Sequence, residues 1–353
     1  MKVAIYNLIA SFAFLSLGNS FRLHTTVPPP LRVSSSLSES NYGNDAVDSC
    51  RTKDGISRRG AIAACAIPLV FLPLTSLAAE TPPENYECLL DLPPLPEDQV
   101  RIYLCRHGQT ENNRLRKVQG ARVDPPINTN GIIQAQNAGK ALSKASPCPQ
   151  TFFCSDLQRA RLTAEQASSQ INPQIVPKPL SLLREVDFGP VAEGQPVATA
   201  KAGMEATYAA WAIGNVDYRP TGGGESGREV LNRAVESMEY LVKQAEDSPN
   251  RCVGAVSHST FIRILVGILL DEPLVKTATR KIDNCSITVL DFPKGFKTQR
   301  LGPKDKLLGG LLSRAPPDFT LDVPICTVVR TNENRHLPEI PLGELLPSRA
   351  RDG

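Results

Sequence analysis

The stretch VRIYLCRHGQTENN, residues 100–113, decides how this chain is expected to fold. Its first six residues form a short apolar run of β-prone side chains, which is typical of a buried strand. The run ends at Arg106, His107 and Gly108, where the chain turns polar. Ligands of parallel α/β proteins bind beyond the carboxyl ends of the strands, so a functional site is expected at this point.

Two further strand-like runs end in the same way. Residues 252–257 lead into His258 and Ser259, and residues 152–154 lead into a segment that contains Arg159. A single histidine in a loop is more often an ordinary surface residue than a functional one. The chain has only four histidines, however, and two of them follow predicted strands. The repetition predicts that two imidazoles and two guanidiniums converge at one edge of a sheet.

The rest of the pattern alternates strands with helices. Helices are expected near residues 129–142, 156–169, 226–241 and 260–270, and two more strands at 286–292 and 325–330. This alternation predicts an α/β fold, a three-layer α/β/α sandwich around a mainly parallel sheet. Its expected parts are a Pro-rich exposed lead-in (80–98), one domain (99–340) with an inserted surface loop (293–324), and a C-terminal tail (341–353).

The charge balance argues against a general binder of nucleic acid or membranes. The 353-residue chain has 39 Lys and Arg and 36 Asp and Glu. Seven of the basic and four of the acidic residues lie in residues 1–79, which leaves 32 of each in residues 80–353. A body without net charge creates no field that would hold a nucleic-acid backbone or an anionic membrane.

The first 79 residues are typical of targeting segments. Residues 1–20 are an apolar run behind a single lysine, ending in small residues, as in a secretory signal peptide. Residues 21–57 are rich in Ser, Thr and Pro, as in a transit peptide or a linker. Residues 58–79 start with paired arginines before the uncharged run 61–79. Two prolines interrupt that run, which favours a twin-arginine-type signal over a membrane anchor.

This order of segments resembles the tripartite presequences of algae with complex plastids. The resemblance implies a plastid location in the thylakoid lumen and no stable membrane anchor after processing. A thylakoid or other membrane protein anchored through residues 61–79 is the alternative.

Seven cysteines follow residue 80, and an odd number cannot all pair within one chain. None stands in a C-x-x-C spacing that would suggest a metal site. A disulfide that involves Cys148 or Cys154 remains open at this point.

Nine segments of the chain, in order, resemble the histidine phosphatase superfamily, branch 1, whose fold is phosphoglycerate mutase-like. They extend over nearly all of residues 99–337. The segments are RHGQTENN (106–113), VQG (118–120), DPPINTNGIIQAQ (124–136), SDLQRARLTAE (155–165), LREVDFGPVAEG (183–194), GGGESGREV (222–230), VSHSTFIRIL (256–265), NCSITVLDF (284–292) and VVRTNENRHL (328–337).

The resemblance implies a reaction on a small anionic phosphorylated substrate, without a metal or other cofactor. In the family's mechanism His107 attacks phosphorus and becomes phosphohistidine, while Glu185 protonates the departing oxygen. Arg106, Arg159 and His258 then correspond to the residues that hold the phosphoryl oxygens, a task that suits planar guanidiniums. The implied substrate-binding positions are Arg106, Asn113, Gln119, Gly120, Arg159, His258 and Ser259.

Ser259 departs from the family pattern, which usually has glycine after the second histidine. A serine there is mildly strained if the position requires a positive φ. Asp187 and Glu193 lie close to Glu185 and are alternative carboxylates. Tyr208 is expected either in the core or in a substrate wall.

Three functions are compatible with these residues. The resemblance favours a metal-independent phosphatase that hydrolyses phosphate monoesters, because the stretch after Glu185 is similar to that of phosphatases. A cofactor-dependent phosphoglycerate mutase is one alternative, and a catalytically weak phospholigand sensor or scaffold is the other. Members of this fold often dimerise, so a homodimer is left open.

Overall fold

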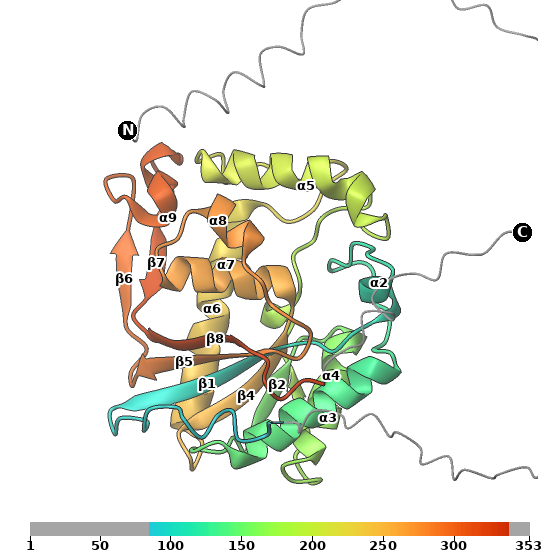
Figure 1. The fold of residues 1–353 in the computed structure, drawn as a ribbon. Helices are drawn as coiled ribbons and strands as arrows, with labels where there is room; N and C mark the ends of the chain where they lie inside the picture. The colour runs from blue at the N-terminus through green and yellow to red at the C-terminus, as the bar shows by residue number, and fades with distance from the viewer. Residues whose placement is uncertain (1–84, 339–353) are drawn as a thin grey trace, which may run out of the picture. The chain divides into compact units, whose positions relative to one another are not determined.

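The computed structural model describes residues 85–338, so the targeting segments predicted in residues 1–79 and the tail predicted in 341–353 lie outside the described residues. Six strands form one sheet in the order β3-β2-β4-β1-β5-β8, and β6 pairs with β7 in a second sheet (Figure 1). The strands are β1 (Gln99–Arg106), β2 (Phe152–Cys154), β3 (Lys178–Pro179), β4 (Cys252–Ser257), β5 (Ile287–Pro293), β6 (Thr298–Leu301), β7 (Leu321–Pro324) and β8 (Thr327–Glu333).

The large sheet is mainly parallel, as predicted. Strands β3, β2, β4 and β1 run parallel to one another. Strand β5 pairs antiparallel with β1 on one side and with β8 on the other. Arg106 at the end of β1 pairs with Ser257 at the end of β4, and Cys154 at the end of β2 pairs with Val256. The carboxyl ends of these three strands therefore meet at one edge of the sheet.

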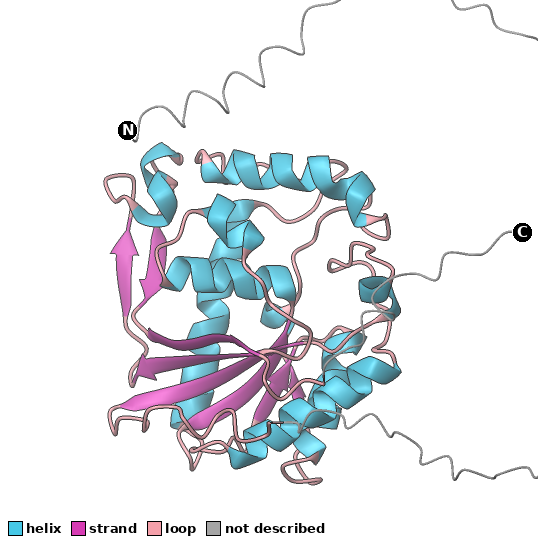
Figure 2. Cartoon of the chain, in the orientation of Figure 1, coloured by secondary structure: helices cyan, strands magenta, loops and turns pink. Residues whose placement is uncertain are grey.

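Helices cover both faces of the large sheet, which gives the three layers (Figure 2). On β1, Ile102 and Leu104 belong to the core under α6 and α7, whereas Tyr103 and Cys105 belong to the core under α3 and α4. This alternation follows from the two-residue period of a strand. The helices are α2 (Glu111–Arg114), α3 (Thr129–Lys144), α4 (Gln158–Ser169), α5 (Val197–Ala212), α6 (Gly227–Glu246), α7 (Ser259–Leu269), α8 (Leu274–Thr279) and α9 (Leu307–Gly310).

The Pro-rich lead-in is not simply exposed. Cys88, Leu89 and Leu92 are buried in the core beside α3. The hydroxyl of Tyr86 also donates to the side chain of Asn137 on α3. The three apolar side chains outweigh the polar composition of the segment, since burying each one removes apolar surface from water.

The segment 293–324 also differs from the predicted surface loop. It contains β6, α9 and β7, and its leucines at 307, 308, 311 and 312 are buried together with Phe319. These side chains join the core under α6 and α7. The prediction was wrong because the leucines of the segment do not show the spacing of a single helix. Leu308 and Gly309 have positive φ angles, which interrupt the helix there.

The seven cysteines among residues 85–338 are all free, so no disulfide through Cys148 or Cys154 is formed.

Trp211 is buried in the core and its indole N–H donates to the carbonyl of Tyr218. Within residues 85–338, no helix is long and apolar enough to cross a bilayer.

Candidate active site

His107 follows β1 and is held with one ring nitrogen available. Its backbone N–H donates to the carbonyl of Ser257 on β4 (2.9 Å), and its Nδ1 lies 2.8 Å from the carbonyl of Gly108. A carbonyl can only accept, so Nδ1 carries the proton and Nε2 carries the lone pair. Burial, and then the charges of Arg159 and Arg106, hold the pKa of this imidazole well below its ordinary value. The ring is therefore neutral at physiological pH.

His258 follows β4 and occupies the N-cap position of α7, where its side chain makes no capping hydrogen bond. Its ring centroid is 5.1 Å from that of His107. The side chain is fully buried, yet neither Nδ1 nor Nε2 has a hydrogen-bond partner. Burial and then the nearby Arg159 guanidinium lower the pKa of this imidazole as well. Buried polar atoms normally have partners, so both ring nitrogens of His258 are available to a ligand.

The two predicted arginines, Arg106 and Arg159, also have buried polar atoms without a hydrogen-bond partner. Arg106 donates from Nη1 to the carbonyl of Ile282 (2.7 Å), and Arg159 donates from Nη2 to the carbonyl of Gly120 (2.8 Å). The Nε atom of each is buried without a partner. Burial, followed by the charge of Arg263, lowers the pKa of Arg106 to about 10. Both guanidiniums stay charged at neutral pH, and each has an N–H group free to donate.

Glu185 lies beside these cations, and its position distinguishes it from the other two carboxylates. Its oxygens accept from the backbone N–H groups of Thr260 (3.1 Å) and Phe261 (2.9 Å) in the first turn of α7. Its charge acts on both Arg106 and Arg159.

Asp187 instead forms a salt bridge with Arg122 at the surface. Glu193 is buried, but its carboxylate accepts from the backbone N–H groups of Arg122, Val123 and Phe188, which ties two loops together. Burial raises the pKa of this carboxyl above its ordinary value. The geometry therefore singles out Glu185.

The predicted substrate-binding residues lie on the loop after β1 and on its neighbours. Asn113 accepts from Asn284 Nδ2 (3.1 Å), and that same amide also donates to the carbonyl of His107 (3.0 Å). Gln119 accepts from the hydroxyl of Thr110 (2.8 Å). A side chain at Gly120 would collide with Glu193, since its Cβ would lie 2.1 Å from Oε1. Gly120 thus leaves room for the carboxylate of Glu193, while its own carbonyl accepts from Arg159.

Ser259 carries none of the strain that its departure from the family pattern suggested. It is the first residue of α7 and does not have a positive φ. The position consequently tolerates serine. Tyr208 is partly buried, and after burial the carboxylate of Glu185 contributes to raising the pKa of its phenol. Tyr208 packs against the core, and its ring meets that of Trp211 edge to face with 5.6 Å between the ring centroids, as the core alternative requires.

Three residues of the site were not singled out in the sequence. Asp124 accepts from Arg159 Nη1 (3.1 Å) and from the backbone N–H of Gln158 (2.6 Å), so it positions the guanidinium. Asn284 and Thr163 hold the backbone around His107, the latter by accepting from the N–H of Gly108. Asp124 and Asn284 stand at the start of quoted motif segments, which was the available signal.

Two neutral imidazoles and two guanidiniums thus meet at the carboxyl edge of the parallel strands. The Nε–H groups of Arg106 and Arg159 and one N–H of His258 are donors without a partner, whereas His107 presents a lone pair. Such a set fits a tetrahedral oxyanion, because each oxygen can accept from a different fixed donor.

The comparisons with known proteins agree with this class of site. A family profile described as the histidine phosphatase superfamily (branch 1) matches residues 102–301. The protein named "Probable phosphoglycerate mutase GpmB" of Proteus mirabilis is 31% identical over 196 residues, 55% of this chain and 85% of that protein. A solved mycobacterial glucosyl-3-phosphoglycerate phosphatase is 30% identical, with a TM-score of 0.46, over 55% of this chain and 91% of that one.

The phosphoglycerate mutase of Bacillus anthracis is 19% identical, with a TM-score of 0.51, over 68% of this chain and 96% of that one. This likeness shows the fold. The chain belongs to the histidine phosphatase superfamily, branch 1, and the phosphoglycerate mutase-like fold expected from the sequence is confirmed.

Proposed function

We propose that this protein is a metal-independent phosphatase that hydrolyses small phosphate monoesters through a phosphohistidine at His107. One observation carries the proposal: the buried ring of His258 has two unsatisfied nitrogens and lies beside the available Nε2 of His107. A phosphoryl group between the rings accepts from the N–H of His258 and presents its phosphorus to His107. The partnerless Nε–H groups of Arg106 and Arg159 supply further donors.

In the first step, the lone pair of His107 Nε2 forms a bond to phosphorus as the bond to the leaving oxygen breaks. Glu185 gives a proton to that oxygen, which leaves as an alcohol. Arg106 and Arg159 neutralise the charge that is spread over the remaining phosphoryl oxygens. The hydrogen bond from His107 Nδ1 to Gly108 keeps the ring oriented throughout.

In the second step, water attacks the phosphohistidine and the P–N bond breaks. Glu185, now ionised, takes a proton from that water, and inorganic phosphate leaves. The same carboxyl thus acts as acid and then as base. None of these steps requires a metal ion.

The test uses the full chain in EDTA with two kinds of substrate. p-Nitrophenyl phosphate has a leaving group that departs without a proton, whereas a sugar phosphate needs one. We expect Glu185→Gln to lose much more activity on sugar phosphates than on p-nitrophenyl phosphate, because the acid is needed only for the former. Asp187→Asn is the matched control and should retain both activities.

His107→Ala should abolish turnover and the acid-labile phosphoenzyme. Turnover by folded His107→Ala protein would refute the phosphohistidine route. The substrate 3-phosphoglycerate distinguishes the proposed phosphatase from a phosphoglycerate mutase, the activity in the name of the Proteus mirabilis relative. A mutase would yield 2-phosphoglycerate with little phosphate released, whereas the proposed phosphatase releases phosphate.

We further propose that the processed protein works in the thylakoid lumen of a plastid, on the basis of the segments in residues 1–79. A fluorescent reporter behind residues 1–84 should accumulate in that lumen. Reporter in the cytosol or stroma, or held in a membrane through residues 61–79, would contradict this location.

A further inference from the structure

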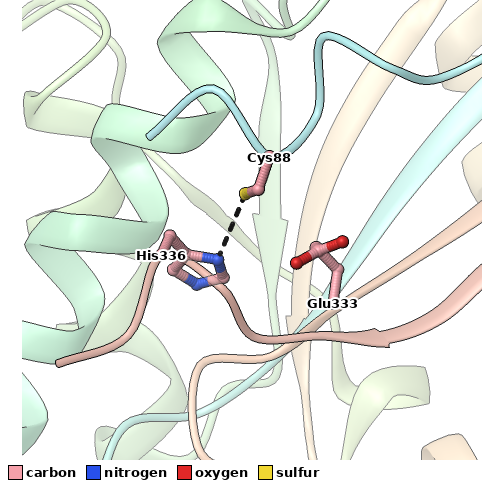
Figure 3. A group of neighbouring side chains, drawn as sticks. All are labelled: Cys88, Glu333 and His336. Atoms are coloured by element: carbon pink, nitrogen blue, oxygen red, sulfur yellow. Dashed lines mark hydrogen bonds between the residues drawn. The ribbon is translucent and has the colours of Figure 1, made fainter. Parts of the chain in front are cut away.

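Three potential metal ligands from opposite ends of the described chain meet away from the residues of the proposed reaction. Cys88 comes from the lead-in, Glu333 from the last residue of β8, and His336 from the turn that follows (Figure 3). The thiol, one carboxylate oxygen and a ring nitrogen all lie within 4.8 Å of one another. All three side chains are buried.

The histidine is already held as metal-binding histidines are. Its Nε2 lies 3.0 Å from the carbonyl of Cys285, and a carbonyl can only accept, so Nε2 carries the proton. Nδ1 therefore presents its lone pair, and it lies 3.8 Å from the sulfur of Cys88. A bond from the second ring nitrogen to a backbone carbonyl is the usual arrangement that fixes the tautomer of a ligating imidazole. Burial lowers the pKa of this ring to about 4, so it is neutral.

The carboxylate is likewise held by partners outside the cluster. Arg335 donates from Nη2 to Glu333 Oε2 (2.8 Å), and Arg330 donates from Nη1 to the same oxygen (3.0 Å). Both arginines also pair with Asp91, so two cations face two anions before any metal binds. Ligating carboxylates are commonly hydrogen-bonded in this manner. The arginines orient Glu333, and Asp91 offsets part of their repulsion of a bound cation.

We propose that Cys88, Glu333 and His336 bind one zinc-class divalent cation, Zn²⁺ or Co²⁺, in a structural site. A thiolate and an imidazole select such a metal over Mg²⁺ and Ca²⁺, which prefer oxygen ligands. Binding replaces the S–H bond of Cys88 by a sulfur–metal bond and releases one proton to solvent. Three protein ligands leave the fourth tetrahedral position to water.

The site joins the two ends of the domain. Cys88 and His336 are 248 residues apart in sequence, so a shared metal closes nearly the whole fold into one loop. The constraint also reaches β1, because Cys285, whose carbonyl holds His336, donates its N–H to the carbonyl of Arg106 (3.0 Å). The metal thus stabilises the fold, while the proposed hydrolysis proceeds without it.

Cobalt provides a readout that does not depend on activity. Titration of the reduced full chain with Co²⁺ should give one bound equivalent, with thiolate-to-cobalt charge-transfer absorption and the visible bands of a tetrahedral site. Cys88→Ser should abolish the charge-transfer absorption, and Glu333→Gln should weaken binding by at least about tenfold. Cys148→Ser, which removes a half-buried thiol elsewhere, is the matched control and should behave as the unaltered chain.

Zn²⁺ should displace the cobalt and raise the melting temperature by roughly 5–10 °C at a hundredfold excess over its Kd. This shift should vanish in Cys88→Ser, whose folding in the metal-free state is checked by circular dichroism. Folded protein without charge-transfer absorption, or absorption that persists in Cys88→Ser, would overturn the proposal. If Cys88→Ser does not fold, His336→Gln tests the same site, and retained metal binding by that variant would refute it.

Discussion

Strand β1 carries two arginines, the buried Arg101 and the half-buried Arg106, and they differ in what surrounds them. Arg101 donates from Nε and Nη2 to the two oxygens of Asp291, both at 2.7 Å, and from Nη2 to the carbonyl of Pro93. Arg106, five residues further on, has a carbonyl for Nη1 but no partner for its buried Nε. Burial lowers the pKa of both, but at Arg101 the bonds and charge of Asp291 outweigh it and leave the pKa raised. The fold satisfies the N–H groups of Arg101, whereas the Nε–H of Arg106 is available to an anion.

The buried histidines repeat the contrast. His336 has a partner at each ring nitrogen, Cys88 and the carbonyl of Cys285. His258 has a partner at neither. The difference teaches that burial alone does not identify a residue of the phosphoryl site, since Arg101 and His336 are as buried as His258. What separates the two kinds is whether the fold itself satisfies their hydrogen bonds.

Removal of the paired arginine should have the largest effect on stability. Arg101→Met leaves Asp291 buried without its cation, so we expect the free energy of unfolding to fall by about 3–5 kcal/mol. Urea denaturation followed by circular dichroism measures it. The kcat of the remaining folded protein should be unchanged, because Arg101 does not contact the site.

The double variant Arg101→Met with Asp291→Leu is the control for this expectation. It removes both charges, so most of the lost stability should return. If the double variant is as unstable as Arg101→Met, the ion pair with Asp291 does not account for the stability that Arg101 provides. The proposed difference between Arg101 and Arg106 would then be wrong.

Removal of the unpaired arginine should affect activity and spare stability. Arg106→Met deletes a donor to the phosphoryl group, so kcat/KM should fall by about 10²–10³-fold, or roughly 2.7–4 kcal/mol. The free energy of unfolding should stay the same or rise, because a cation with a buried, unsatisfied N–H has been removed. Steady-state kinetics and urea denaturation on the same preparation check both parts. If Arg106→Met loses as much stability as Arg101→Met, the two arginines do not differ in their structural role, which would contradict the comparison.

An added anion should stabilise the protein through the unsatisfied residues. Inorganic phosphate at a hundred times its Kd should raise the free energy of unfolding by about 2.7 kcal/mol. Arg106→Met at the same phosphate concentration should gain much less, because its affinity is lower. Chloride at equal ionic strength is the control for screening. Equal stabilisation of both proteins by phosphate would mean that the anion binds elsewhere.

The sequence predicted the layers and the parallel strands because these rest on local signals, whereas Glu185 and the substrate-binding positions came from the resemblance to the family. Apolar runs such as 100–105 end where polar residues begin, and those ends mark the edge at which ligands bind. Two features escaped because they depend on contacts between distant segments. Asp124 becomes a partner of Arg159 only when the loop before α3 reaches α4. The leucines of 307–312 become core only when the insert folds back on α7.

The pH dependence of stability gives the smallest effect and separates the two histidines. The pKa of His336 falls from its ordinary value of 6.5 to about 4 on folding, so the unfolded chain binds a proton that the native state does not. Its contribution to stability is present above pH 6.5 and is lost as the pH falls towards 4, by up to about 1.4 kcal/mol per pH unit. His258, whose pKa is also lowered, adds a loss in the same direction.

Phosphate should reduce the share of His107, whose pKa is also lowered, together with that of His258. A bound anion favours the protonated form of both rings and accepts from the ring of His258, so stability should fall less steeply below pH 6.5 when phosphate is saturating. The share of His336 should persist, because its partners lie within the fold. Urea midpoints in EDTA between pH 7.5 and 5, with and without phosphate, measure both slopes, and phosphate should change the slope of His258→Gln less than that of the unaltered chain. An unchanged slope with phosphate in the unaltered chain would show that His258 does not meet the anion.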